Sequence, residues 1–269
     1  MKLYPLLYEA AKGAEDALKK RLVIYGENRG TYNTITLFSP FAFSKIIKRI
    51  EQEEGLFDPS THTDLIIKKA AKQATIGKIS YGLVVDNNND FAQVTSSAAI
   101  GGFGPLIYQI AMYQHPNLWL TSDNSLKPAS EKVWNKMFEL SNQGMYERKF
   151  LGKISKDELL MRAQGVGNVV LEPYINDLLK NAKRPTEEVF LDWLKENNLK
   201  PEQFGYLWAY KKSQHDPKIE ELFNGGERFI QQAEDVFNMS KEDLKDIITG
   251  SGTKLFLGLY GSQASYTEE

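Results

Sequence analysis

Apolar and polar positions divide the chain into a first part with strands and a second part that is helical. Apolar residues recur every three or four positions in residues 3–20, which predicts an amphipathic helix. Residues 21–25 and 32–38 are rich in β-branched and aromatic side chains and are typical of strands. The polar, glycine-containing stretch 26–30 between them indicates a turn. We therefore expect a β-hairpin near the start of the chain.

The same patterns extend this first part to about residue 150. Ser39 is a good N-cap and Pro40 a good first helical residue, so a helix is expected to begin there and to end at Gly55. The remaining expected elements are helices over residues 64–74, 106–113 and 128–140 and strands over residues 79–85, 91–98, 118–120 and 146–150.

Strand-like alternation almost disappears after residue 155. Helical stretches follow, separated by glycines and prolines, at residues 156–164, 169–182, 186–197, 201–212, 217–238 and 240–249. The aromatic residues within 204–210 have spacings that a helical core would bury, and we favour that interpretation over a base-stacking platform. The sequence thus predicts an α/β domain over residues 1–152 and an all-helical domain over residues 153–269.

The composition of the chain limits the kinds of site and partner that we expect. The chain has no cysteine, which excludes disulfides and thiolate chemistry, and its three histidines are scattered, so no metal site is expected. A net charge of −2 gives no clear nucleic-acid signal. No apolar run reaches membrane length, and residues 1–9 lack the features of a signal peptide, so we expect neither a transmembrane segment nor a membrane partner.

The strongest chemical signal is the glycine-rich stretch 100–105, which joins an expected strand to an expected helix. Unpaired backbone N–H groups and the positive end of the helix dipole make such a turn an anion site, and glycines allow close approach. A Rossmann loop requires a third glycine that is missing here, and a Walker loop requires a Gly-Lys-Ser/Thr sequence that is absent. A third pattern, Q/R-x-x-G-x-G/A, matches the spacing from Ala99 to Gly104, with alanine in its first position.

That pattern is the signature of the general N-acetyltransferase (GNAT) superfamily. The stretches Gly104–Tyr108 and Ile110–Met112, the strand end at Leu120–Asp123 and the pair Val133-Trp134 resemble a GNAT-like group found in bacteriophage genomes. The resemblance covers residues 79 to about 150. It implies a mixed, mostly antiparallel sheet with flanking helices and acetyl-CoA as the cofactor.

The resemblance also implies a site. The backbone of Ile100, Gly101, Gly102, Phe103, Gly104, Pro105 and Leu106 would hold the pyrophosphate of coenzyme A. Ser96, Ser97 and Ala98 would pair with the pantetheine arm, and the splay between this strand and the strand at 118–121 would admit the thioester. Two departures stand out: Ala99 occupies the usual Gln/Arg position, and Trp134 stands where many members carry a catalytic tyrosine.

Three side chains are candidates for catalysis. Asp123 is a candidate general base, although an aspartate there also suits a helix cap. Tyr108 and Tyr146 are candidates to protonate a leaving thiolate, although such tyrosines are commonly core or rim residues.

Three functions remain open at this point. The first is an acetyl-CoA-dependent N-acyltransferase of phage-like origin with an unknown amine substrate. The second is a non-catalytic virion or assembly protein that retains the fold. The third is a protein that binds a bacterial target during host takeover. A protein partner would bind through the helical domain or the apolar segment 256–260, and the expected location is the host cytoplasm or the virion.

Overall fold

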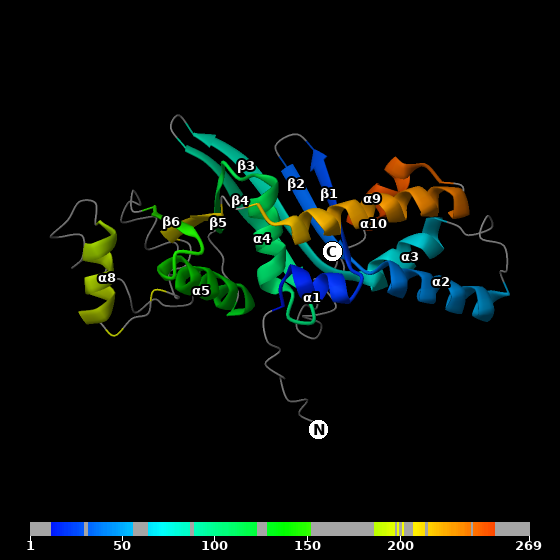
Figure 1. Ribbon diagram of the computed structural model, residues 1–269, viewed down its shortest axis with the longest axis horizontal. Helices are drawn as coiled ribbons and strands as arrows, with labels where there is room; N and C mark the ends of the chain where they lie inside the picture. Colours follow the sequence, from blue (N-terminus) through cyan, green and yellow to red (C-terminus); the bar gives the residue numbers. More distant parts are fainter. Residues whose placement is uncertain are drawn as a thin grey trace, which may run out of the picture. The chain divides into compact units, whose positions relative to one another are not determined.

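The chain has a mixed α/β fold with one open, mostly antiparallel sheet, shown in a computed structural model (Figure 1). The structure describes residues 12–29, 32–55, 64–86, 89–122, 128–151, 186–196, 198, 201, 207–212, 215–237 and 239–250. In these residues it has seven strands, in the order β1-β2-β3-β4-β5-β7-β6, and eight helices. No described helix combines the length and apolarity that crossing a bilayer requires.

Most of the predicted elements are present. The strands are β1 (Val23–Arg29), β2 (Tyr32–Phe38), β3 (Thr75–Asp86), β4 (Asn89–Ala99), β5 (Trp119–Ser122), β6 (Glu147–Phe150) and β7 (Trp208–Lys211). The helices are α1 (Ala14–Lys19), α2 (Pro40–Glu54), α3 (Asp64–Ala74), α4 (Gly104–Gln114), α5 (Pro128–Asn142), α8 (Glu187–Glu196), α9 (Pro217–Phe237) and α10 (Lys241–Gly250).

The chain forms two compact units, each assembled from separate segments. Unit 1 comprises Met1–Ser80, Ser96–Ala111 and His215–Glu269, and unit 2 comprises Tyr81–Thr95 and Met112–Gln214. The boundary predicted between residues 152 and 153 lies outside the described residues. So do the helices predicted at 156–164 and 169–182 and the apolar segment 256–260.

One predicted helix is wrong in its last part. Residues 208–211 of the stretch 201–212 form β7, which pairs with β5 and β6, so the second half of the chain contributes a strand to the sheet. The cause is the continuous run Leu207, Trp208, Ala209 and Tyr210, all of which are buried. A short apolar run without periodicity fits a buried strand as well as a buried helix.

Unit 1 begins with the predicted hairpin. β1 and β2 pair antiparallel from Val23↔Phe38 to Arg29↔Tyr32. The hydroxyl of Ser39 accepts a hydrogen bond from the Ala42 amide at 3.2 Å, which caps α2.

Aromatic rings fill the core of unit 1. Phe38 packs against Phe43 and Phe229 at centroid distances of 5.6 and 5.9 Å, and Tyr25 contacts Phe38 edge-on. Phe229 comes from α9, so a helix near the end of the chain completes the core begun by the first hairpin.

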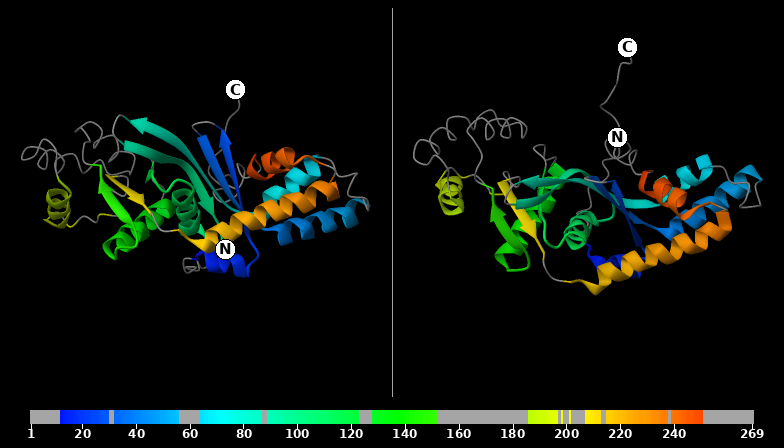
Figure 2. Two further views of the ribbon diagram at one scale, coloured as in Figure 1. Left: turned by 45° about the horizontal axis from the view of Figure 1, so that its top comes forward. Right: turned by 90° about the horizontal axis from the view of Figure 1, so that it is seen from above.

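Helix α9 crosses β1 at two glycines and lies beside α10 (Figure 2). A Cβ atom at Gly226 would lie 2.3 Å from the backbone oxygen of Ile24, and one at Gly225 would lie 3.0 Å from the Val23 side chain. Glycine in a helix interior is unfavourable relative to alanine, so its presence here follows from the close approach of the two backbones.

Unit 2 contains a parallel pair of strands. β4 and β5 are paired from Phe91↔Trp119 to Val94↔Ser122, while β7 pairs antiparallel with β5 and with β6. The core on one face of these strands includes Trp134 of α5, whose ring lies 5.7 Å from that of Tyr210. Trp134 is therefore a buried core residue.

We expect Gly226→Ala to lower the free energy of unfolding by about 1–3 kcal/mol, because the added methyl group meets backbone atoms that cannot move aside locally. Urea denaturation followed by circular dichroism measures this change. Gly250→Ala is the matched control, since a Cβ atom there meets nothing within 4 Å. Equal stability of the two variants would contradict the close packing of α9 on β1.

Candidate functional site

The glycine-rich turn between β4 and α4 is the candidate site. Gly101 and Gly102 adopt left-handed backbone conformations, with φ angles of 65° and 80°, which side chains with a Cβ rarely adopt. Helix α4 begins immediately afterwards at Gly104, and the carbonyl of Phe103 accepts from the amides of Leu106 and Ile107. The sequence therefore places a strand end, a glycine turn and a helix N-terminus in direct succession, as predicted.

The carbonyl side of the turn is occupied by Lys12. Its ammonium group donates to the Gly101 carbonyl at 2.6 Å, and its backbone amide donates to the Gly102 carbonyl at 3.0 Å. In a trans peptide unit the N–H points opposite to the C=O. The Gly102 amide therefore points away from Lys12, because it shares a peptide unit with the Gly101 carbonyl.

The amide side of the turn offers several donors. Among the described residues, the N–H groups of Gly101, Gly102 and Gly104 have no hydrogen-bond acceptor. The Gly104 amide points away from the helix, since the Phe103 carbonyl in the same peptide unit points into it. These donors, together with the helix dipole, favour an anion.

Two cations accompany the turn. The ammonium groups of Lys12 and Lys20 each lie 5.6 Å from the centroid of the Phe103 ring. Phe103 itself is buried and anchors the turn, whereas the glycines beside it are only half-buried. The local charge therefore adds to the attraction that the backbone exerts on an anion. The sequence patterns did not indicate either lysine, because both are far from the glycines along the chain.

Gly77 of β3 allows this strand to pack closely against the residues on either side of the turn. A Cβ atom at Gly77 of β3 would lie 3.0 Å from Ala99 and 3.1 Å from Ile107. The Ile100 amide, at the end of β4, donates to the Ile76 carbonyl at 2.9 Å. These contacts fix the start of the turn against β3.

The predicted site residues are placed as follows. Ser96, Ser97 and Ala98 lie at the end of β4 and are half-buried. Ser97 is brought together with Tyr108 of α4, since their hydroxyl oxygens are 2.5 Å apart. Tyr108 is buried, and Tyr146 is a buried residue of unit 2 just before β6. Asp123 lies outside the described residues.

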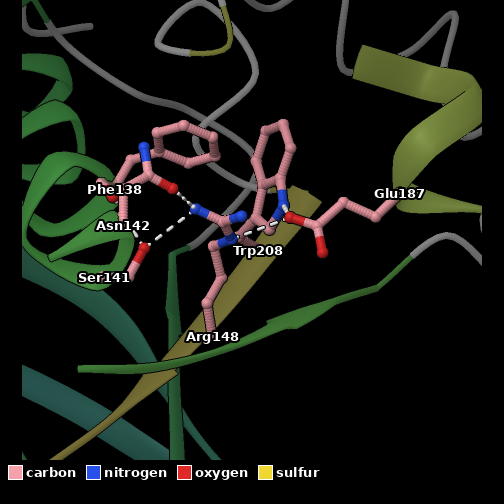
Figure 3. Close-up of polar contacts among 6 residues, drawn as sticks. All are labelled: Phe138, Ser141, Asn142, Arg148, Glu187 and Trp208. Atoms are coloured by element: carbon pink, nitrogen blue, oxygen red, sulfur yellow. Dashed lines mark hydrogen bonds and ion pairs between the residues drawn. The ribbon is translucent and has the colours of Figure 1, made fainter. Parts of the chain in front are cut away.

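A second polar cluster lies in unit 2 around Arg148 of β6 (Figure 3). Arg148 forms an ion pair with Glu187 at 2.7 Å and donates to Ser141 and Asn142 at 2.9 and 2.6 Å. Its guanidinium lies 4.2 Å from the centroid of the Phe138 ring. Two of the three guanidinium nitrogens, Nε and Nη1, are thus engaged within the protein, which indicates a structural role.

Glu187 connects this cluster to the core of unit 2. Its carboxylate also accepts from the indole N–H of Trp208 at 2.9 Å, so α8 is tied both to β6 and to β7. Nearby, burial raises the pKa of the Tyr210 hydroxyl well above its usual value, which keeps this hydroxyl protonated. Neither observation gives this cluster a catalytic group. In the described ranges, no three His, Asp or Glu side chains could hold a metal ion.

Comparisons with known proteins add no family to this picture: no family model, no curated protein and no solved structure matches the chain. The chemistry of the glycine-rich turn therefore has to be argued from its own residues.

We expect Glu187→Ala to lower the free energy of unfolding by about 1–3 kcal/mol, because it leaves the Trp208 indole and the Arg148 guanidinium without their shared acceptor. Glu188→Ala, at the exposed neighbouring position, is the control and should change stability by less than about 0.5 kcal/mol. Urea denaturation measures both values. If the two variants are equally stable, the carboxylate does not hold α8 in place.

Proposed function

We propose that this chain is an acetyl-CoA-dependent N-acyltransferase with a GNAT-like fold and a phage-like origin, acting in the host cytoplasm or packaged in the virion. The observation that carries the proposal is the set of three amides at Gly101, Gly102 and Gly104 that have no acceptor among the described residues. They fit a pyrophosphate, which needs several donors at short range and a positive local potential.

Several features of the turn support this assignment. Lys12 binds the Gly101 carbonyl, so the Gly102 amide of the same peptide unit points away from Lys12 and is open to a ligand. Lys12 and Lys20 supply positive charge. The parallel neighbours β4 and β5 also agree with the arrangement that the resemblance implies.

The proposed roles follow from these positions. The amides of Gly101, Gly102 and Gly104 bind the pyrophosphate, because the Ile100 and Leu106 amides donate within the protein and Pro105 has no N–H. The β4 segment Ser96–Ala98 positions the pantetheine arm. When bound, the coenzyme supplies an acyl group as a thioester. An amine attacks the thioester carbonyl and loses its proton to water or to Asp123, while the coenzyme leaves as a thiolate that takes up a proton. Binding and orientation of the coenzyme by the turn lower the barrier, because holding two reactants in place removes the entropic cost of bringing them together.

We expect coenzyme A and acetyl-CoA to bind the full chain with an affinity that depends on Lys20. Lys20→Glu places a carboxylate near Phe103 of the turn and should weaken binding by about fivefold, the equivalent of one exposed charge contact of about 1 kcal/mol. Isothermal titration calorimetry measures the dissociation constant. Lys48→Glu, an exposed lysine of α2 in the same unit, is the matched control and should leave the affinity unchanged.

Two results would contradict the proposal. One is the absence of both a heat of binding and a thermal shift at about 1 mM coenzyme A, the weak limit of useful affinity. The other is equal weakening by Lys20→Glu and Lys48→Glu, which would place the ligand elsewhere. Acetyl transfer is followed with a thiol reagent in the presence of a panel of amines. Because the chain has no cysteine, the reagent reports only the released coenzyme.

A non-catalytic virion or assembly protein is the second candidate, and Tyr108 favours it. The hydroxyl of this buried tyrosine is engaged by Ser97, which leaves it poorly placed to protonate a thiolate. Ala99 also provides no side-chain contact to a ligand. Coenzyme binding without turnover on any amine, together with recovery of the chain from purified particles, would support this candidate over the first.

A further inference from the structure

One face of the sheet in unit 2 carries paired, half-buried aromatic rings flanked by lysines. Phe91 of β4 and Trp119 of β5 are register partners, so their side chains lie side by side on one face. On β5 the burial alternates, with Leu120 buried and Trp119 only half-buried. Phe91 is likewise half-buried. Both rings therefore retain surface that a ligand can contact.

The strand register places the lysines on this same face. Leu120 pairs with Tyr210 on the buried face, so the next residue of β7, Lys211, shares the face of Trp119. Lys149 of β6 pairs with Ala209 and falls on that face as well. The face thus presents Phe91 of β4, Trp119 of β5, Lys211 of β7 and Lys149 of β6, and we call these four residues the aromatic–lysine face. The exposed acid Glu147 lies on the same face.

The distances confirm that these side chains gather. The Lys149 ammonium lies 5.7 Å from the ring centroids of both Phe91 and Trp119. The Lys211 ammonium lies 5.8 Å from the Trp119 centroid. Two cations therefore approach one indole, with the second ring beside it.

We propose that the aromatic–lysine face binds single-stranded nucleic acid. Aromatic rings on a sheet surface stack with unpaired bases, and neighbouring lysines pair with the backbone phosphates. A duplex does not fit this chemistry, because its bases are already stacked on one another. The chain carries a net charge of −2, so attraction by the whole molecule does not explain such binding, and the recognition has to be local. This proposal does not depend on coenzyme binding by unit 1.

The test uses the full chain and a fluorescein-labelled oligothymidylate of about 12 nucleotides, a length within the site size of known single-strand platforms. Fluorescence anisotropy measures the dissociation constant. Trp119→Leu retains apolar bulk but removes the stacking surface, and it should weaken binding about tenfold. Trp119→Phe retains a ring and should preserve most of the affinity. Lys195→Gln, an exposed lysine of α8 in the same unit, is the control and should have no effect.

The salt dependence provides a second measurement. Two lysine–phosphate contacts predict a slope of log K against log salt of about −1.4, and the double variant Lys149→Gln/Lys211→Gln should bring that slope close to zero. If circular dichroism shows that Trp119→Leu does not fold, the salt slopes of the native chain and of the double lysine variant test the proposal instead.

Three outcomes would overturn the proposal. The first is no binding at about 0.1 mM protein, the weak end of non-specific binding. The second is binding that Trp119→Leu leaves unchanged, which would identify a contact with any polyanion. The third is a salt slope that the double lysine variant does not alter.

Discussion

The parallel pairing of β4 with β5 is the constraint on which the arrangement of the chemically interesting residues depends. Parallel neighbours cannot be joined by a tight hairpin, so the chain between them has to cross over, and here α4 forms that crossover. The reversal after β4 needs two residues with positive φ, which Gly101 and Gly102 provide. The same pairing sets Phe91 beside Trp119 on one face. Both proposed sites are thus consequences of one strand pairing.

Local patterns in the sequence were sufficient for most elements and for the glycine turn before α4. The hairpin of β1 and β2, the cap at Ser39 and the turn before α4 all follow from neighbouring residues, because turn chemistry and periodicity act over short distances. Long-range pairing is not encoded in this way. The run around Trp208 carries no period, so only its partners β5 and β6 identify it as a strand.

The residues that the sequence analysis missed likewise owe their positions to contacts between distant parts of the chain. Lys12 precedes the glycine turn by many residues, and only the folded chain brings its ammonium to the Gly101 carbonyl. Lys149 and Lys211 lie on separate strands, and strand register alone places them around Trp119. From the sequence alone, Gly226 is only an unfavourable residue for a helix interior. In the structure it is the position where α9 contacts the backbone of β1.

The discontinuity of unit 1 has a consequence for synthesis on the ribosome. Glu15 of α1 forms an ion pair with Lys218 of α9, 203 positions away, and α9 also covers β1. At about 5–20 residues per second, the nascent hairpin waits about 10–40 s before α9 emerges. Throughout this interval Phe38 lacks the Phe229 ring that later packs against it. Unit 1 is therefore completed only after all of unit 2 has been translated.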